Sequence, residues 1–220
     1  MDLHLHEAIA LISLDDEKGN FTPAGGYINY AFAAALIMDL MLLERIRLDK
    51  DKVQLRTNAI TDSRALNQVI ERIQKRKKDR RVQDWMHDLV QRVTKLRTAC
   101  AEKLIQDGIL KKEEGKILWV FSVDRYPTKD AQPENELRQR LKALMLDAST
   151  TPDTKERMLL AIVLKCNLYS AMISDKKDRK EAKARLEALT ASAEMQAALG
   201  KAIDEMHASI MVATSVVITS

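Results

Sequence analysis

Residues 27–43, with the sequence YINYAFAAALIMDLMLL, form the longest apolar run in the chain. The run contains Asn29 and Asp39, and it is shorter than the roughly 20 apolar residues that a bilayer core requires. A carboxylate near the centre of a membrane span is also costly. An apolar helix without a polar face is typical of a helix that other helices surround. We therefore predict that this run is the central helix of a globular core.

The composition of the whole chain also favours helices. Its 220 residues include only six glycines and four prolines, and they are 46% hydrophobic and 31% charged. These values exclude a disordered or low-complexity chain. A chain of this length buries roughly 70% of its surface on folding and needs no metal or disulfide for stability. We predict a single, mainly helical domain over residues 1–220.

Hydrophobic periodicity outlines the other elements around the central helix. Two segments alternate apolar and polar residues, and each follows a helix and a charged turn. We expect two short β-hairpins there, one of them protruding: the first at 46–55, the second with a polar turn ending at Gly115 and a return strand at 117–121. The predicted helices span residues 3–14, 23–43, 63–77, 82–108 (a break near Val90 is left open), 133–148, 153–173, 177–189 and 192–217.

The two cysteines indicate a reducing environment. Cys100 and Cys166 both have apolar neighbours at helical spacing, which favours buried free thiols over a disulfide. The first fourteen residues lack the basic start and the small-residue cleavage site of a signal peptide. We therefore expect a cytoplasmic protein, with a peripheral location on a membrane left open.

The sequence contains no recognisable catalytic or metal-binding motif. Its four histidines are not spaced as metal ligands, and the chain has neither HExxH nor paired CxxC motifs. The glycine-rich motifs GxGxxG and GxxxxGK[ST] are missing, as is the nucleophile motif GxSxG. We therefore expect no metal, no cofactor and no enzymatic activity.

The positive charge of the chain is concentrated in one segment. Residues 75–81, KRKKDRR, carry six basic side chains and one acidic one, while the whole chain has a formal net charge of +4. The segment is interpreted either as a solvated helix end or as a patch that faces lipid headgroups or nucleic acid. Arg92, Lys95 and Arg97 extend the positive charge along the next helix. Clusters of four to eight basic residues are typical of binding to anionic membranes.

The second hairpin contains a pair of aromatic residues, Trp119 and Phe121. They either pack into the core or project outward as an apolar contact for a membrane or a protein partner. A helix followed by a hairpin is also the order found in winged-helix DNA-binding domains. However, the run at 27–43 is too apolar to lie in a DNA groove. We therefore prefer a peripheral membrane or adaptor protein and keep nucleic-acid binding as the alternative.

Several short blocks of the sequence, taken in order, carry a family resemblance: residues 39–48, 82–85, 96–110, 126–141 and 155–162. Together they resemble the Golgi phosphoprotein 3 family, whose eukaryotic members are phosphatidylinositol-4-phosphate-binding Golgi adaptors. The resemblance extends from about residue 5 to residue 216, and we expect the chain to be a bacterial relative of these adaptors. It implies a mainly helical domain and a hairpin that presses into the bilayer, here through Trp119 and Phe121.

The family's headgroup pocket can be transferred to this chain residue by residue. Of its two basic residues three positions apart, the second falls on Arg97 and the first on Thr94. The pocket tryptophan falls near Ala24, and a further arginine near Ala33. The resemblance therefore implies that the specific headgroup pocket is largely lost. We expect anion contact by Arg97, with Thr94 and Arg92 beside it; the expected partner is an anionic membrane surface, with a protein partner or a homo-oligomer left open.

Overall fold

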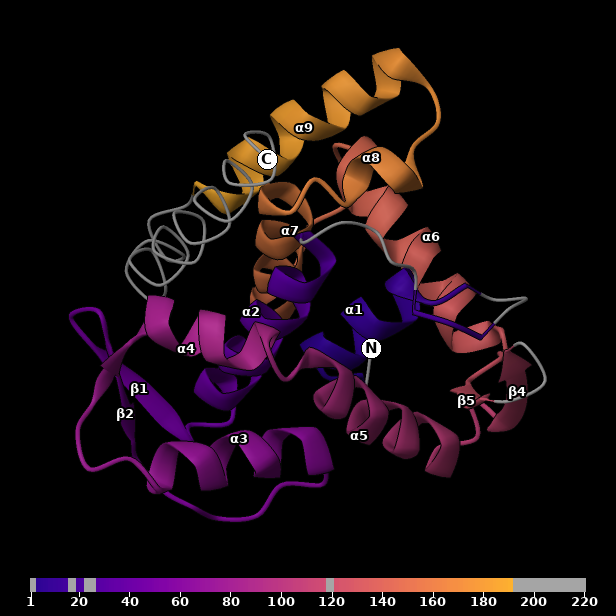
Figure 1. The fold of residues 1–220 in the computed structure, drawn as a ribbon. Helices are drawn as coiled ribbons and strands as arrows, with labels where there is room; N and C mark the ends of the chain where they lie inside the picture. Colours follow the sequence, from indigo (N-terminus) through magenta and orange to yellow (C-terminus); the bar gives the residue numbers. More distant parts are fainter. Residues whose placement is uncertain (1–2, 16–18, 22–26, 118–120, 192–220) are drawn as a thin grey trace, which may run out of the picture.

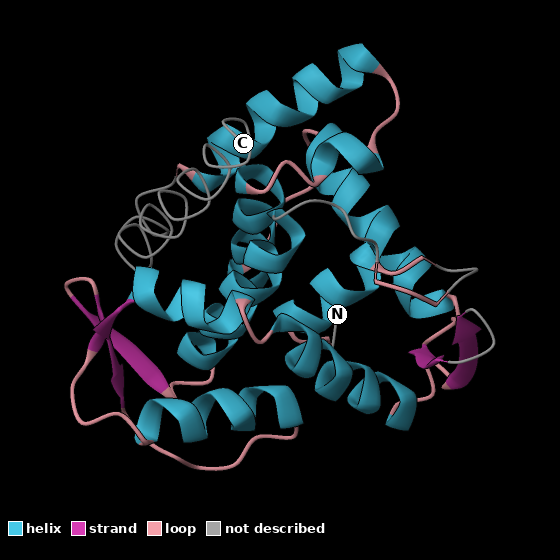
Figure 2. Ribbon diagram, in the orientation of Figure 1, coloured by secondary structure: helices cyan, strands magenta, loops and turns pink. Residues whose placement is uncertain are grey.

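The structure is a computed structural model that describes residues 3–15, 19–21, 27–117 and 121–191, without the side chains of residues 114–123. The described part is mainly helical, as predicted, and its strands are confined to two small sheets (Figure 2). The elements are α1 (Leu5–Ser13), α2 (Tyr27–Leu42), β1 (Ile46–Asp49), β2 (Lys52–Leu55), α3 (Arg64–Gln74), β3 (Arg80–Arg81), α4 (Val82–Val90), α5 (Val93–Gln106), β4 (Glu113–Ile117), β5 (Phe121–Arg125), α6 (Gln132–Leu146), α7 (Thr154–Lys165), α8 (Tyr169–Met172) and α9 (Lys176–Thr190).

Helix α2 is the central helix that the apolar run predicts. It contacts α1, α3, α4, α5 and α7, and the other helices surround it in Figure 1. Its side chains from Ile28 to Leu40 are buried except for Asn29, so all sides of the helix contribute to the core. Burial of this apolar surface is the main driving force for folding. None of the helices that the structure describes is long and apolar enough to cross a membrane.

The first hairpin is confirmed, and a third strand extends it. Strands β1 and β2 pair antiparallel with Ile46 opposite Leu55. Strand β3 then pairs with β2, placing Arg80 opposite Val53. The sequence prediction of a helix to residue 77 was wrong, since α3 ends at Gln74. Strand β3 pairs with the edge of β2 at Lys52 and Val53, where backbone groups of β2 would otherwise be unpaired.

The second hairpin is present, but the predicted positions of its turn and its return strand were wrong. Its strands are β4 and β5, with Gly115 opposite Val123 and Ile117 opposite Phe121. The charged segment that we expected to be a turn is therefore part of a strand. Lys112, the residue before β4, forms an ion pair with Asp124 of β5, with Lys112 Nζ 2.8 Å from Asp124 Oδ2. Such pairs of opposite charge stabilise neighbouring strands. Trp119 lies outside the described residues, and so does the side chain of Phe121.

Two helix predictions need comment. The break near Val90 that the sequence left open is present, since α4 ends at Val90 and α5 begins at Val93. The prediction of one helix over 153–173 was wrong, because α7 and α8 are separated at Asn167, whose φ of 55° lies in the left-handed region. Asparagine adopts that conformation more readily than most residues. The predicted helix at 192–217 lies outside the described residues.

Candidate functional site

Arg97 is buried in an aromatic environment on helix α5. Only 8% of the residue is exposed, and its Cζ lies 5.1 Å from the ring centre of Phe21 and 5.7 Å from that of Phe32. Its Nε and Nη2 atoms have no hydrogen-bond partner among the described residues. Burial lowers the pKa of Arg97 to about 10, so the guanidinium still carries its charge at neutral pH. A buried cation without a carboxylate is costly and is stabilised by any anion that reaches it.

The loop before α2 brings Phe21 to Arg97. Phe21 forms an isolated bridge with Leu14, and Gly19 lies between them with a φ of +62°. The carbonyl of Gly19 accepts a 2.7 Å hydrogen bond from the backbone N–H of Tyr126, the residue that follows β5. The rings of Phe21 and Tyr126 are 6.2 Å apart. We call Arg97, Phe21, Phe32 and Tyr126 the Arg97 site, and it adjoins the base of the β4–β5 hairpin.

The three predicted anion-binding residues do not form one cluster. Thr94 is exposed one turn before Arg97, on the same side of α5. Arg92 occupies the position before the helix and is also exposed, but its Nε lies 3.6 Å from Asp88 Oδ2. The structure therefore places Thr94 beside the Arg97 site and Arg92 with a different group of residues.

That second group is centred on Asp88, which is surrounded by four arginines. Arg72 makes two hydrogen bonds to its carboxylate, the one from Nη2 measuring 2.5 Å. Arg76 and Arg80 each have one nitrogen 3.9 Å from Asp88 Oδ1. The hydrogen bond from Arg72 holds the pKa of Asp88 below its usual value. We call Arg72, Arg76, Arg80, Arg92 and Asp88 the Asp88 cluster. Four cations and one carboxylate leave the cluster with an excess of positive charge.

Arg72 and Asp88 were not predicted as functional residues, because the basic segment 75–81 does not include them. One signal was available: Arg76 follows Arg72 by four residues, and Arg92 follows Asp88 by four. Side chains four residues apart lie on the same side of a helix. This spacing brings Arg76 close to Arg72 and Arg92 close to Asp88, and in the structure the ion pair between Arg72 and Asp88 joins α3 to α4.

A serine, a histidine and an aspartate also meet in the core, in an arrangement that the sequence did not reveal. The His6 ring nitrogens lie 2.6 Å from Asp39 Oδ2 and 3.0 Å from Ser63 Oγ. This order is that of a hydrolase triad. However, each of the three residues is at most 1% exposed, so no substrate can reach Ser63. Asp39 also accepts hydrogen bonds from two backbone N–H groups of α1, and the network therefore joins helices α1, α2 and α3.

The remaining reactive residues are inert in their surroundings. Cys100 and Cys166 are free and buried, as predicted. Burial raises the pKa of Cys166 to about 12 and that of Cys100 well above its usual value, so neither thiol is ionised at neutral pH. Within the described residues, no group of three potential ligands could hold a metal ion.

The nucleic-acid alternative gains no support from the helices that precede the hairpins. A recognition helix must expose side chains to a DNA groove. Helix α2, which precedes β1, is buried along most of its length, and α5, which precedes β4, turns Arg97 toward the core. The alternative stays an untested prediction from the order of the elements.

The family comparison agrees with the fold and with the order of blocks in the sequence. The family model of Golgi phosphoprotein 3 (GPP34) matches residues 5–206, which is nearly the whole chain. A search of curated proteins found no match. The chain therefore belongs to the Golgi phosphoprotein 3 family, and the suspected resemblance is confirmed.

Proposed function

We propose that this member of the Golgi phosphoprotein 3 family is a non-enzymatic adaptor that binds peripherally to anionic membranes, without strict selectivity for phosphatidylinositol 4-phosphate. The observation that carries the proposal is the buried guanidinium of Arg97, two of whose nitrogens have no acceptor among the described residues. Phosphate oxygens are strong acceptors for such donors. A lipid phosphate would therefore supply the hydrogen-bond acceptors that the described residues do not offer to Arg97.

The neighbours of Arg97 support weak rather than specific headgroup recognition. Thr94 stands where the family pocket has a basic residue, and it offers a hydroxyl but no charge. Ala33, near which a further arginine was expected, is buried in α2. Ala24, the expected tryptophan position, lies outside the described residues. Each missing charge-assisted hydrogen bond weakens binding by about 1.5–3 kcal/mol.

The β4–β5 hairpin supplies the apolar part of the proposed membrane contact. It lies at the edge of the molecule in Figure 1, and Tyr126 connects its base to the Arg97 site. In the sequence, Trp119 falls between the last residue of β4 and the first residue of β5. A tryptophan at such a position is well suited to the interface between headgroups and acyl chains. Charge at the Arg97 site and apolar contact at the hairpin can then act on one membrane surface.

Sedimentation with liposomes tests this function. The vesicles are phosphatidylcholine alone, phosphatidylcholine with phosphatidylserine, and phosphatidylcholine with phosphatidylinositol 4-phosphate at equal surface charge. We expect similar binding to both anionic vesicles, little binding to the neutral one, and weaker binding at high salt. Arg97→Ala and Trp119→Ala should each reduce binding, whereas Lys180→Ala on the exposed face of α9 should not, although it removes the same charge as Arg97→Ala.

Two results would overturn the proposal. Equal binding to all three vesicles, or to none, contradicts electrostatic attachment to a membrane. Binding to the phosphatidylinositol-4-phosphate vesicle alone, lost in Arg97→Ala, shows that the specific pocket is retained despite Thr94.

A further inference from the structure

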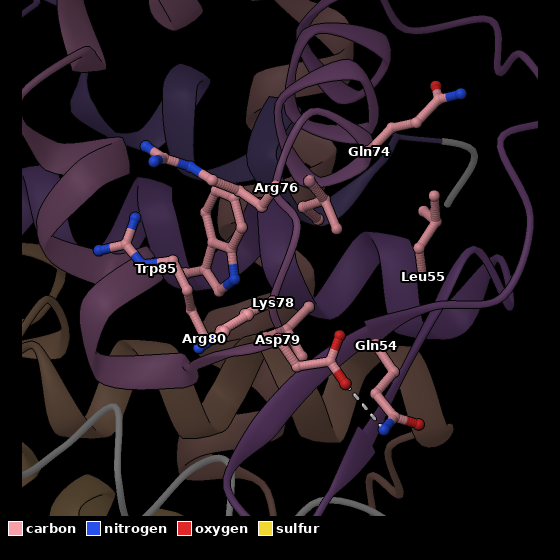
Figure 3. A pocket seen from close by; sticks show the side chains of 10 residues that line it. Gln54, Leu55, Gln74, Arg76, Lys78, Asp79, Arg80 and Trp85 are labelled. Atoms are coloured by element: carbon pink, nitrogen blue, oxygen red, sulfur yellow. Dashed lines mark hydrogen bonds between the residues drawn. The ribbon is translucent and has the colours of Figure 1, made fainter.

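A cavity next to the Asp88 cluster has the chemistry of a second anion site, remote from the Arg97 site. It has a volume of about 360 Å³ and lies between strand β2, the end of α3 and the start of α4. The basic segment 75–81 forms much of its rim (Figure 3). In Figure 1 it belongs to the end of the molecule that carries β1 and β2, whereas the β4–β5 hairpin lies at the opposite end.

Three cationic side chains line this cavity: Arg76, Lys78 and Arg80. One carboxylate, that of Asp79, also lines the cavity. Its Oδ2 already accepts a 2.9 Å hydrogen bond from Gln54 Nε2. The lining residues therefore carry an excess of two positive charges. Their arrangement leaves the cations, rather than the carboxylate, available to a ligand.

The nearby carboxylate of Asp88 does not neutralise these cations. Arg72 already makes two hydrogen bonds to it, and its distance of 3.9 Å from both Arg76 and Arg80 is too long for a hydrogen bond. Arg80 does donate from Nη2 to the backbone carbonyl of Asp84, at 3.4 Å. The guanidinium groups of Arg76 and Arg80 therefore retain donors that a strong acceptor can use.

A second observation at the cavity independently indicates a missing acceptor. Trp85 lines the cavity and is 1% exposed, and its indole Nε1–H has no hydrogen-bond partner among the described residues. The guanidinium of Arg80 lies over the indole, with its Cζ 5.3 Å from the ring centre. Buried indole donors usually have a partner. An acceptor oxygen bound in the cavity would satisfy this N–H.

We propose that the cavity lined by Arg76, Lys78, Arg80 and Trp85 binds a phosphomonoester, either free or on a lipid headgroup. The dianion matches the excess charge of the lining residues, and its oxygens accept hydrogen bonds from the arginine forks and the indole. The volume of the cavity exceeds that of one phosphate group, so part of the molecule that bears the phosphate also fits. This site is independent of Arg97 and of the membrane function proposed above.

Fluorescence of Trp85 provides a direct measurement of binding. Trp85 and Trp119 are the two tryptophans of the chain, so the variant Trp119→Phe leaves Trp85 as the single reporter. This variant is titrated with inorganic phosphate, with sulfate at equal ionic strength, and with vesicles that contain phosphatidic acid or phosphatidylserine. Phosphatidic acid presents a phosphomonoester, whereas phosphatidylserine presents a diester.

We expect a saturable change in Trp85 fluorescence with phosphate, with phosphatidic acid vesicles, or with both. A response to inorganic phosphate assigns the site to free phosphate compounds, and a response to phosphatidic acid vesicles alone assigns it to a lipid headgroup. Arg76→Ala and Arg80→Ala should each weaken binding about tenfold or more, whereas Lys180→Ala and Arg97→Ala should leave it unchanged. Arg80→Lys should recover part of the affinity, which separates loss of binding from loss of folding.

Three results would overturn the inference. The first is the absence of a saturable response to both phosphate and phosphatidic acid. The second is an equal response to sulfate or to phosphatidylserine vesicles, because attraction by charge alone predicts no preference for the monoester. The third is unchanged affinity in Arg76→Ala and Arg80→Ala variants that retain the native circular dichroism spectrum.

Discussion

The Arg97 site and the Asp88 cluster are both basic regions of one chain, but they differ in the burial of their cations and in the carboxylates beside them. Arg97 is a single buried cation between two aromatic rings, with no acceptor for two of its nitrogens among the described residues. In the Asp88 cluster, four arginines that are more exposed share one carboxylate. The Arg97 site lacks an acceptor because the guanidinium is buried away from solvent. The Asp88 cluster lacks acceptors because four arginines outnumber its one carboxylate. Each deficit points to an anion from outside the chain.

The largest effect is expected at the centre of the cluster. Asp88→Asn keeps the size of the side chain but removes the negative charge that the four arginines share. We expect it to lower the free energy of unfolding by about 2–3 kcal/mol, since it leaves Arg72 without a charged partner. Urea denaturation measures this. Glu102→Gln, which breaks the exposed ion pair with Arg64, is the control and should change stability by less than about 0.5 kcal/mol. Equal effects of the two variants would mean that Asp88 is as dispensable as a surface carboxylate.

The contribution of Asp88 should also depend on pH. Its pKa in the folded protein is lowered, chiefly by the hydrogen bond from Arg72. A carboxyl group with a lowered pKa stabilises the folded state above its unfolded pKa and loses this effect as the pH falls through its folded pKa. The stability difference between the wild type and Asp88→Asn should therefore be constant near neutral pH and shrink below about pH 4. A difference that does not change with acid would contradict the ion pair.

The Arg97 site depends on the close approach of the loop at Gly19 to Tyr126 and Pro127. Substitutions of two glycines, Gly19 and Gly108, test this contact. Gly19 and Gly108 both have positive φ values, of 62° and 77°. A Cβ on Gly19 would lie 2.5 Å from the backbone nitrogen of Pro127, whereas one on Gly108 would meet no atom within 4 Å. We expect Gly19→Ala to lower the free energy of unfolding by about 2 kcal/mol and Gly108→Ala by about 1 kcal/mol. Thermal unfolding would show equal losses if the contact with Pro127 contributes nothing.

The same substitution in the two regions should have opposite signs. Arg97→Met replaces a buried, unpartnered cation with an apolar side chain of similar length, and we expect a gain of about 1 kcal/mol in the free energy of unfolding. Arg72→Met removes the main partner of Asp88 and should be destabilising. Urea denaturation of both variants measures the contrast. A loss of stability in Arg97→Met would show that the guanidinium contributes more through its contacts with Phe21 and Phe32 than it costs by burial.

The fold was largely predictable from sequence because its main signals are local. The apolar run of α2 and the three- and four-residue spacings located most of the helices without tertiary information. The errors arose where tertiary contacts decided the structure. Arg80 and Arg81 form a strand because β2 lies beside them, and Glu113 belongs to a strand because β5 pairs with it. Charged residues in an exposed ladder resemble a turn in sequence.

The candidate sites were predictable only in part. The family resemblance identified Arg97, but its burial depends on Phe21, which is brought close by a loop contact far along the chain. Residues 75–81 were recognised as basic, but their sequence does not show that Trp85 provides an unpaired donor beside them. The network of His6, Asp39 and Ser63 joins residues up to 57 positions apart, and no motif marks it. Such sites are set by packing rather than by spacing.

The smallest effect on stability is expected at the outer members of the Asp88 cluster. Arg76 is exposed and lies 3.9 Å from Asp88, a geometry in which an ion pair contributes little. Arg76→Ala should therefore change the free energy of unfolding by less than about 0.5 kcal/mol in urea, even though it should weaken phosphate binding strongly. Together these outcomes would assign Arg72 to the fold and Arg76 to the ligand. A loss of stability close to that of Asp88→Asn would instead mean that Arg76 is needed to hold Asp88, and the excess charge of the cluster would be structural.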